Sequence, residues 1–108
     1  MRACRIDRNQ PEIVKYFRDH GFTVLLIHTL KNCCDIIISK NSQTACIEIK
    51  DGLKPTSAQK LTPGEIKFKD EWQGLYYIVR STDDADSVMK EFVMLDEYGN
   101  KLNLVEVK

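Results

Sequence analysis

Three charged residues, Asp35, Glu48 and Lys50, have types and a spacing that suit metal-assisted chemistry. Each belongs to an apolar, β-branched run typical of a strand, and the polar segment around Asn41–Ser42 is typical of a turn between two strands. Antiparallel pairing about that turn sets Asp35 approximately opposite Glu48, and Lys50 lies two residues further on the same face. Because directly opposed residues have Cβ atoms about 4.5–5.5 Å apart, the three side chains are expected to converge at one end of a hairpin.

Two carboxylates that face each other repel, and removal from water strengthens the repulsion. A cation between Asp35 and Glu48 would relieve it. Mg²⁺ suits this place because it prefers oxygen ligands, uses one or two carboxylates and keeps waters and substrate phosphates, with Mn²⁺ as the alternative ion. Such an ion would hold a phosphate and activate a water, while Lys50 would orient that water or neutralise developing charge. A salt-bridged cluster at a strand end is the competing interpretation.

The elements that must position these residues follow from apolar periodicity. They are a helix over residues 10–20, strands over 22–30, 35–39 and 44–50, a loop over 51–60, a helix after Thr62 that ends by Gly74, a strand over 75–80 and a helix over 81–92. This order, α-β-β-β-α-β-α, describes an α/β fold with a mixed central sheet flanked by helices. The tail, residues 93–108, is expected to form a strand or a short hairpin of uncertain role.

Two of the helices carry recognisable start signals. Asn9 is the predicted N-cap of the first helix, with Glu12 in the position of a capping-box partner. Thr62 and Glu65 form the same pattern at the start of the second helix, and the apolar residues between 66 and 72 are expected to form one apolar side of it. The aromatic residues Trp72, Tyr76 and Tyr77 are interpreted as core rather than as base-stacking groups.

Length and composition limit the protein class. The 108 residues fit a single domain over 1–108, with its core at about 8–92, and 43% hydrophobic with 30% charged residues is ordinary for a globular protein. No apolar run is long enough to cross a bilayer or to act as a signal peptide, so the expected location is the cytoplasm, with no membrane partner. In that compartment the four cysteines are expected to remain thiols.

The charge pattern allows a local phosphate-binding surface but no broad one. Sixteen basic and sixteen acidic residues give a net charge of zero, which counts mildly against strong nonspecific binding of a polyanion. Lysines are nevertheless crowded between residues 50 and 69, and Lys54 and Lys60 lie in the loop next to the predicted site. These two lysines are therefore the candidates for contact with phosphates.

The segments "CDIII" and "CIEIKDG" together resemble the D…E-x-K signature of the PD-(D/E)-x-K nuclease superfamily. With the preceding helix, "KLTPGEIKFKDEW" and "LYYIVRS" followed by "DDA", they resemble the small stand-alone virus-type replication-repair nucleases of phages and bacteria, over roughly residues 8–90. The resemblance implies a restriction-endonuclease-like fold. It also implies a magnesium-dependent endonuclease that hydrolyses DNA at branched or replication-repair structures.

The resemblance assigns roles to individual residues. It makes Asp35 and Glu48 metal ligands, makes Lys50 catalytic and adds Glu12 as an assisting acidic group. Glu65 replaces the usual Gln, which leaves open whether Glu12 and Glu65 are catalytic or only helix caps. The usual Pro before the Asp is a cysteine here. A catalytically inactive nucleic-acid-binding module of the same fold is the alternative function, and a two-fold DNA substrate would suit a homodimer.

Overall fold

The computed structural model describes residues 7–92 and confirms the predicted order of elements. These are α1 (Gln10–Asp19), β1 (Thr23–Leu26), β2 (Ile36–Lys40), β3 (Gln43–Ile49), the short 3₁₀ helix η1 (Thr56–Gln59), α2 (Pro63–Glu71), β4 (Leu75–Val79) and a last helix that includes residues 82–92. The predicted strand or hairpin in residues 93–108 lies outside the described residues. No helix within 7–92 is long and apolar enough to cross a membrane.

The four strands form one mixed sheet in the order β1-β2-β3-β4, with β1–β2 and β2–β3 antiparallel and β3–β4 parallel. Asn41 and Ser42 have φ angles of 54° and 69°, as a two-residue hairpin turn requires, because positive φ at both positions matches the twist of the strands. The β2–β3 register ends at the pair Ile36↔Ile47. One more step along this register sets Asp35 opposite Glu48, as the sequence predicts.

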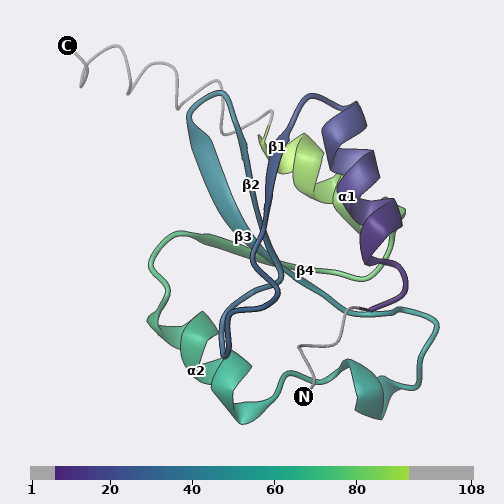
Figure 1. The fold of residues 1–108 in the computed structure, drawn as a ribbon, viewed down its shortest axis with the longest axis vertical. Helices are drawn as coiled ribbons and strands as arrows, with labels where there is room; N and C mark the ends of the chain where they lie inside the picture. The colour runs from purple at the N-terminus through teal and green to yellow at the C-terminus, as the bar shows by residue number, and fades with distance from the viewer. Residues whose placement is uncertain (1–6, 93–108) are drawn as a thin grey trace.

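One face of the sheet carries the hydrophobic core. Figure 1 shows α1 and the 82–92 helix together on this side of the sheet. Their apolar residues pack with alternate strand residues, which are fully or almost fully buried: Ile13, Val14 and Phe17 of α1, Ile36, Ile38, Ile47, Ile49 and Val79 of the sheet, and Ala85, Val88, Met89 and Phe92 of the last helix. The alternation leaves the intervening strand residues, including Glu48, on the other face.

Asn9 does not cap α1, which corrects the predicted capping box with Glu12. Its backbone is already helical (φ −87°, ψ −2°), and its side chain makes no capping hydrogen bond. The Asn9 amide Nδ2 instead donates to the carbonyl oxygens of Lys50 and Arg80, each at 3.1 Å. These carbonyls follow the ends of the parallel strands β3 and β4, so Asn9 fixes the start of α1 at the end of the sheet where the charged residues lie.

The first strand is shorter than predicted. The apolar run over residues 22–30 is a strand only at Thr23–Leu26, where register with β2 is available. The chain then leaves the sheet in a loop over residues 27–35, and Leu25 and Leu30 are each 57% exposed. The strand-like composition of residues 27–30 is therefore not sufficient to extend β1. A strand continues only where a neighbouring strand is available for pairing.

The capping box of α2 is confirmed, but its predicted apolar side is not buried. The Thr62 hydroxyl accepts from the Glu65 backbone N–H at 3.2 Å, and the Glu65 carboxylate accepts from the Thr62 N–H at 2.9 Å. No residue of α2 is buried, and Ile66 is 46% exposed. On the face of the sheet opposite the core, the ring centroids of Phe68 and Tyr76 are 6.2 Å apart. The Phe68 ring also stacks on Trp72.

We predict that Thr62→Ala lowers the free energy of unfolding by about 0.5–2 kcal/mol, because it removes the N-cap acceptor of α2. Urea unfolding measures the loss. Thr23→Ala is the matched control, since Thr23 is an exposed residue outside any cap. Equal losses in the two variants would contradict the capping role.

Candidate active site

Asp35 is held at the start of β2 by the ends of its neighbouring strands. Its backbone N–H donates to the Ile47 carbonyl, and its own carbonyl accepts from the Ile27 N–H. The carboxylate oxygen Oδ2 accepts from the Ile49 N–H at 2.7 Å, which fixes the side chain toward β3. Burial raises the pKa of Asp35, and the hydrogen bond from Ile49 offsets this only in part.

Glu48 is the most deeply buried carboxyl group of the site, with an exposed fraction of 3%. Burial, followed by the negative charges of Asp35 and Glu65, raises the pKa of Glu48 to about 9. A carboxyl group with this pKa holds a proton at neutral pH as long as no metal ion is bound. The negative charge of Asp35 thus disfavours ionisation of Glu48, which is the repulsion that the sequence predicts for this end of the hairpin.

Lys50 supplies part of that positive charge. Its Nζ lies 3.4 Å from Glu48 Oε2 and 3.1 Å from Glu65 Oε1, so it connects β3 with the first turn of α2. Burial lowers the pKa of Lys50, but the two carboxylates outweigh this and the net shift is upward. Burial alone would raise the pKa of Glu65, but the hydrogen bond from the Thr62 N–H and the charge of Lys50 outweigh it. The pKa of Glu65 is therefore lowered, and Glu65 stays ionised. Glu65 is thus both a helix cap and an ion-pair partner of Lys50.

The other predicted site residues, Glu12, Lys54 and Lys60, lie outside the cluster of Asp35, Glu48 and Lys50. Glu12 is exposed on the first turn of α1, and no group of three or more His, Cys, Asp or Glu side chains in the described chain is placed to hold a metal ion. Glu12 is thus not grouped with Asp35 and Glu48 as a third ligand, and its metal role stays a prediction. Lys54 Nζ lies 3.6 Å from Asp7 Oδ1, and Lys60 is exposed without an ion pair within residues 7–92.

Two groups near the site were missed by sequence reasoning. Asp51 follows Lys50 and is 3% exposed, and its carboxylate accepts from Arg8 Nε at 2.6 Å and from the Leu53 N–H at 2.9 Å. The Leu53 hydrogen bond, together with Arg8, lowers the pKa of Asp51. The Asp-Gly pair after β3 signals a turn, but nothing local predicts that Arg8 reaches it.

The second missed group is the hydroxyl of Tyr76, which is buried without a hydrogen-bond partner among residues 7–92. Tyr76 pairs with Cys46 in the sheet register and so faces the same side as Glu48. Burial, followed by the charges of Glu48 and Glu65, raises the pKa of Tyr76. Its position corrects the interpretation of Tyr76 as a core residue, whereas Tyr77 packs against the core as expected.

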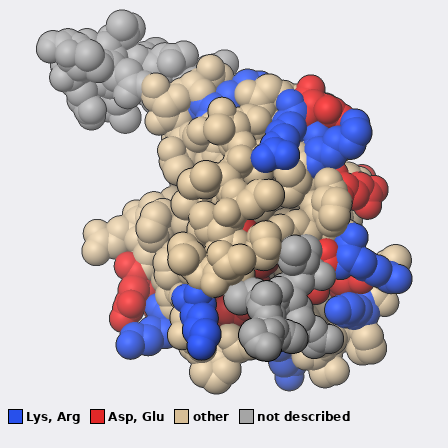
Figure 2. All heavy atoms as spheres, in the orientation of Figure 1, with Lys and Arg blue, Asp and Glu red and all other residues tan. Residues whose placement is uncertain are grey.

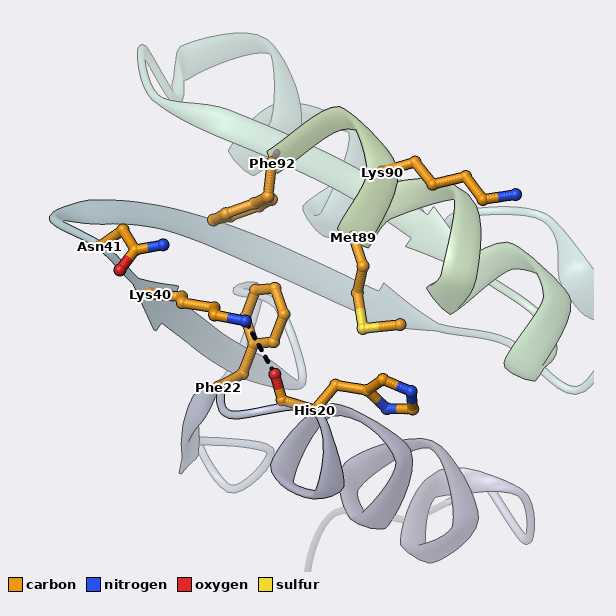
Figure 3. Close-up of a pocket in the computed structure, with 7 residues that line it drawn as sticks. All are labelled: His20, Phe22, Lys40, Asn41, Met89, Lys90 and Phe92. Atoms are coloured by element: carbon orange, nitrogen blue, oxygen red, sulfur yellow. Dashed lines mark hydrogen bonds between the residues drawn. The ribbon is translucent and has the colours of Figure 1, made fainter. Parts of the chain in front are cut away.

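The surface is hollowed at both ends of β2. A cavity of about 310 Å³ lies beside the carboxylates, with Asp35 and Glu65 in its wall. A second cavity, of about 240 Å³, lies at the far end near Lys40, between Phe22 and Phe92, and has no carboxylate among its lining residues (Figure 3). On the face seen in Figure 2, acidic and basic side chains alternate around the margin. Of the two cavities, only the one at Asp35 has carboxyl groups in its wall.

Comparisons of the chain with protein-family models, with curated proteins and with solved structures found no match.

We predict that the metal-free protein loses stability as the pH rises from about 6 to 8. Because folding raises the pKa of Glu48 to about 9, the folded state binds more protons than the unfolded state in this range, and stability then falls with pH. The pKa values of Glu65 and Asp51 are lowered on folding, so both groups are ionised in the folded and the unfolded state above about pH 6. They therefore add no slope in this range. Urea titrations at several pH values in the presence of a chelator measure the slope.

Asp35→Asn is the matched control for this slope. Asparagine keeps an oxygen for the Ile49 N–H but carries no charge, so the variant should be as stable as the parent or more stable at pH 8, with a shallower slope. A slope that is unchanged in Asp35→Asn would contradict the repulsion between Asp35 and Glu48.

We also predict that Tyr76→Phe leaves stability unchanged or increases it, because a buried hydroxyl without a partner contributes a desolvation cost and no hydrogen bond. Tyr16→Phe is the comparison, since its hydroxyl donates to Asp86 Oδ1 at 3.4 Å and its loss should cost about 0.5–1.5 kcal/mol. Thermal unfolding of both variants tests the contrast. A clear loss in Tyr76→Phe would mean that the hydroxyl has a partner in solution.

Proposed function

We propose that this protein is a metal-dependent nuclease that hydrolyses phosphodiester bonds in DNA, with Asp35, Glu48 and Lys50 at its centre. The observation that carries the proposal is the pairing of Asp35 with Glu48, whose pKa is raised to about 9 partly by the charge of Asp35. A buried and a partly buried carboxyl group that repel each other, next to an ammonium group, are a typical arrangement for phosphoryl chemistry. The D…E-x-K resemblance agrees with it.

The residues present fit Mg²⁺ or Mn²⁺. Two carboxylates are enough for such an ion, because it keeps waters and substrate phosphates for its other positions. Asp35 uses Oδ2 to accept from Ile49, which orients the rest of the carboxylate. When bound, the ion would hold the scissile phosphate and lower the pKa of a water. Glu48 would have to release its proton, so metal binding should become tighter as the pH rises toward 9.

Lys50 has a separate role in this proposal. Its ammonium lies within 3.4 Å of Glu48, so it is next to the ion position without being a ligand. Glu65 holds it there from α2 at 3.1 Å and keeps it protonated. A fixed positive charge at this place stabilises the negative charge that develops on the phosphate in the transition state. Glu65 is therefore a positioning residue for Lys50 in this mechanism.

DNA as substrate and a homodimer as the working unit remain parts of the same proposal. Lys54 and Lys60, in the loop that follows β3, are the proposed phosphate contacts. Lys54 would have to exchange its partner Asp7, 3.6 Å away, for a phosphate. A nucleic-acid-binding module without catalysis is the competing function, and Lys50 distinguishes the two.

We predict that Lys50→Ala slows single-turnover DNA cleavage by on the order of 10²-fold or more, the range for groups that stabilise a transition state. Mg²⁺ should still bind, because no ligand is removed, and DNA affinity in Ca²⁺ should fall only by the amount expected for one phosphate contact. Lys50→Arg should restore the rate only in part, because a planar guanidinium does not replace a compact ammonium.

Lys15→Ala is the matched control. Lys15 is 76% exposed on α1 and pairs only with Asp19, one turn away, so its removal should leave the rate unchanged. Weaker DNA binding by Lys50→Ala with an unaltered cleavage rate would make Lys50 a phosphate clamp and would favour the binding module.

A further inference from the structure

The cavity of about 310 Å³ beside Asp35 is formed by two segments that are distant in sequence. One wall is the loop over residues 27–35, and the other is the first turn of α2 with Glu65. Asn32 of the loop, with a φ of 55°, lies directly against Gly64, where a Cβ atom would overlap its Oδ1. The Asn32 side chain and Gly64 thus join the two walls of the cavity at this point.

The walls of this cavity are chemically mixed. Asp35 and Glu65 contribute two carboxyl groups, whereas Lys31 contributes one ammonium group, so the lining does not favour an anion. The Asn32 side-chain amide has no hydrogen-bond partner within residues 7–92 and can both donate and accept. Leu30, 57% exposed, and the ring of His28 supply apolar and aromatic surface. This combination suits a flat, neutral group that carries N–H donors and ring acceptors.

His28 forms part of the cavity wall. His28 Nδ1 is buried without a hydrogen-bond partner among the described residues, and the His28 ring lines the cavity. A buried nitrogen without a hydrogen-bond partner destabilises the folded protein. A rotation of the His28 ring by 180° would exchange the positions of its nitrogen and carbon atoms.

We propose that this cavity binds one unpaired nucleobase of the DNA next to the cleaved phosphodiester bond, an inference that rests on the proposed nuclease function. A base inside a duplex is paired and stacked, so it does not reach a cavity between a loop and a helix unless it is flipped out or already single-stranded. The protein therefore selects DNA with an unpaired nucleotide at the cut. Leu30 and His28 contact the base faces, the Glu65 carboxylate accepts from an N–H at its edge, and the Asn32 amide donates or accepts there.

The experiment uses a DNA duplex with a single-stranded arm that carries 2-aminopurine at one position at a time, bound to the full chain in Ca²⁺. One unpaired position next to the bond that is cut in Mg²⁺ should change its fluorescence on binding, and the same position in a full duplex should not. An abasic site there should weaken binding about tenfold, in the range for the loss of one stacked base.

Leu30→Ala and Leu53→Ala form a matched pair, because both leucines are exposed in loops and only Leu30 lines the cavity. Leu30→Ala should reduce the fluorescence change several-fold, and Leu53→Ala should leave it as in the parent. If DNA is cleaved in Mg²⁺ but no position responds, or the two variants behave alike, the cavity proposal is wrong and the nuclease proposal stands. If the protein neither binds Mg²⁺ nor cleaves DNA, both proposals fail.

Discussion

Lys50 lies between two carboxylates that come from different elements, and much of the arrangement around the site depends on this contact. Glu48 belongs to β3, whereas Glu65 belongs to the first turn of α2, and the Lys50 ammonium is within 3.4 Å of both. Because α2 buries no residue of its own, hydrophobic packing contributes little to its attachment. The ion pair with Lys50, the contact of Gly64 with Asn32 and the ring contacts of Phe68 therefore position this helix.

The two faces of the sheet differ in polarity and in how far helices cover them. The face under α1 and the 82–92 helix is apolar and close-packed, and it keeps the strands in register. The opposite face carries Glu48, Cys46 and Tyr76 and is only partly covered by α2. A site built on strands of a packed sheet holds its side chains more precisely than a loop does. The hydrogen bonds from Asn9 to the ends of β3 and β4 add to this precision at the charged end.

The thiols near the site contribute packing rather than reactivity. Cys34 and Cys46 are buried, and both are free, as is the half-buried Cys33. Burial raises the pKa of Cys34 and of Cys46, so both stay protonated at neutral pH. A protonated thiol is a poor nucleophile and a poor metal ligand. Cys34, directly before Asp35, is therefore a packing residue at the start of β2.

The sequence by itself determined the order of the elements, the hairpin register and the capping box of Thr62 and Glu65. Each of these depends on residues close together in the chain, where periodicity and turn chemistry are sufficient. Tertiary structure alone decided that Asn9 binds the ends of two strands instead of capping α1, that β1 stops at Leu26, and that α2 leaves its apolar residues exposed. It also decided that Glu65 reaches Lys50, because that ion pair joins segments whose separation in space is set by the packing of the whole sheet.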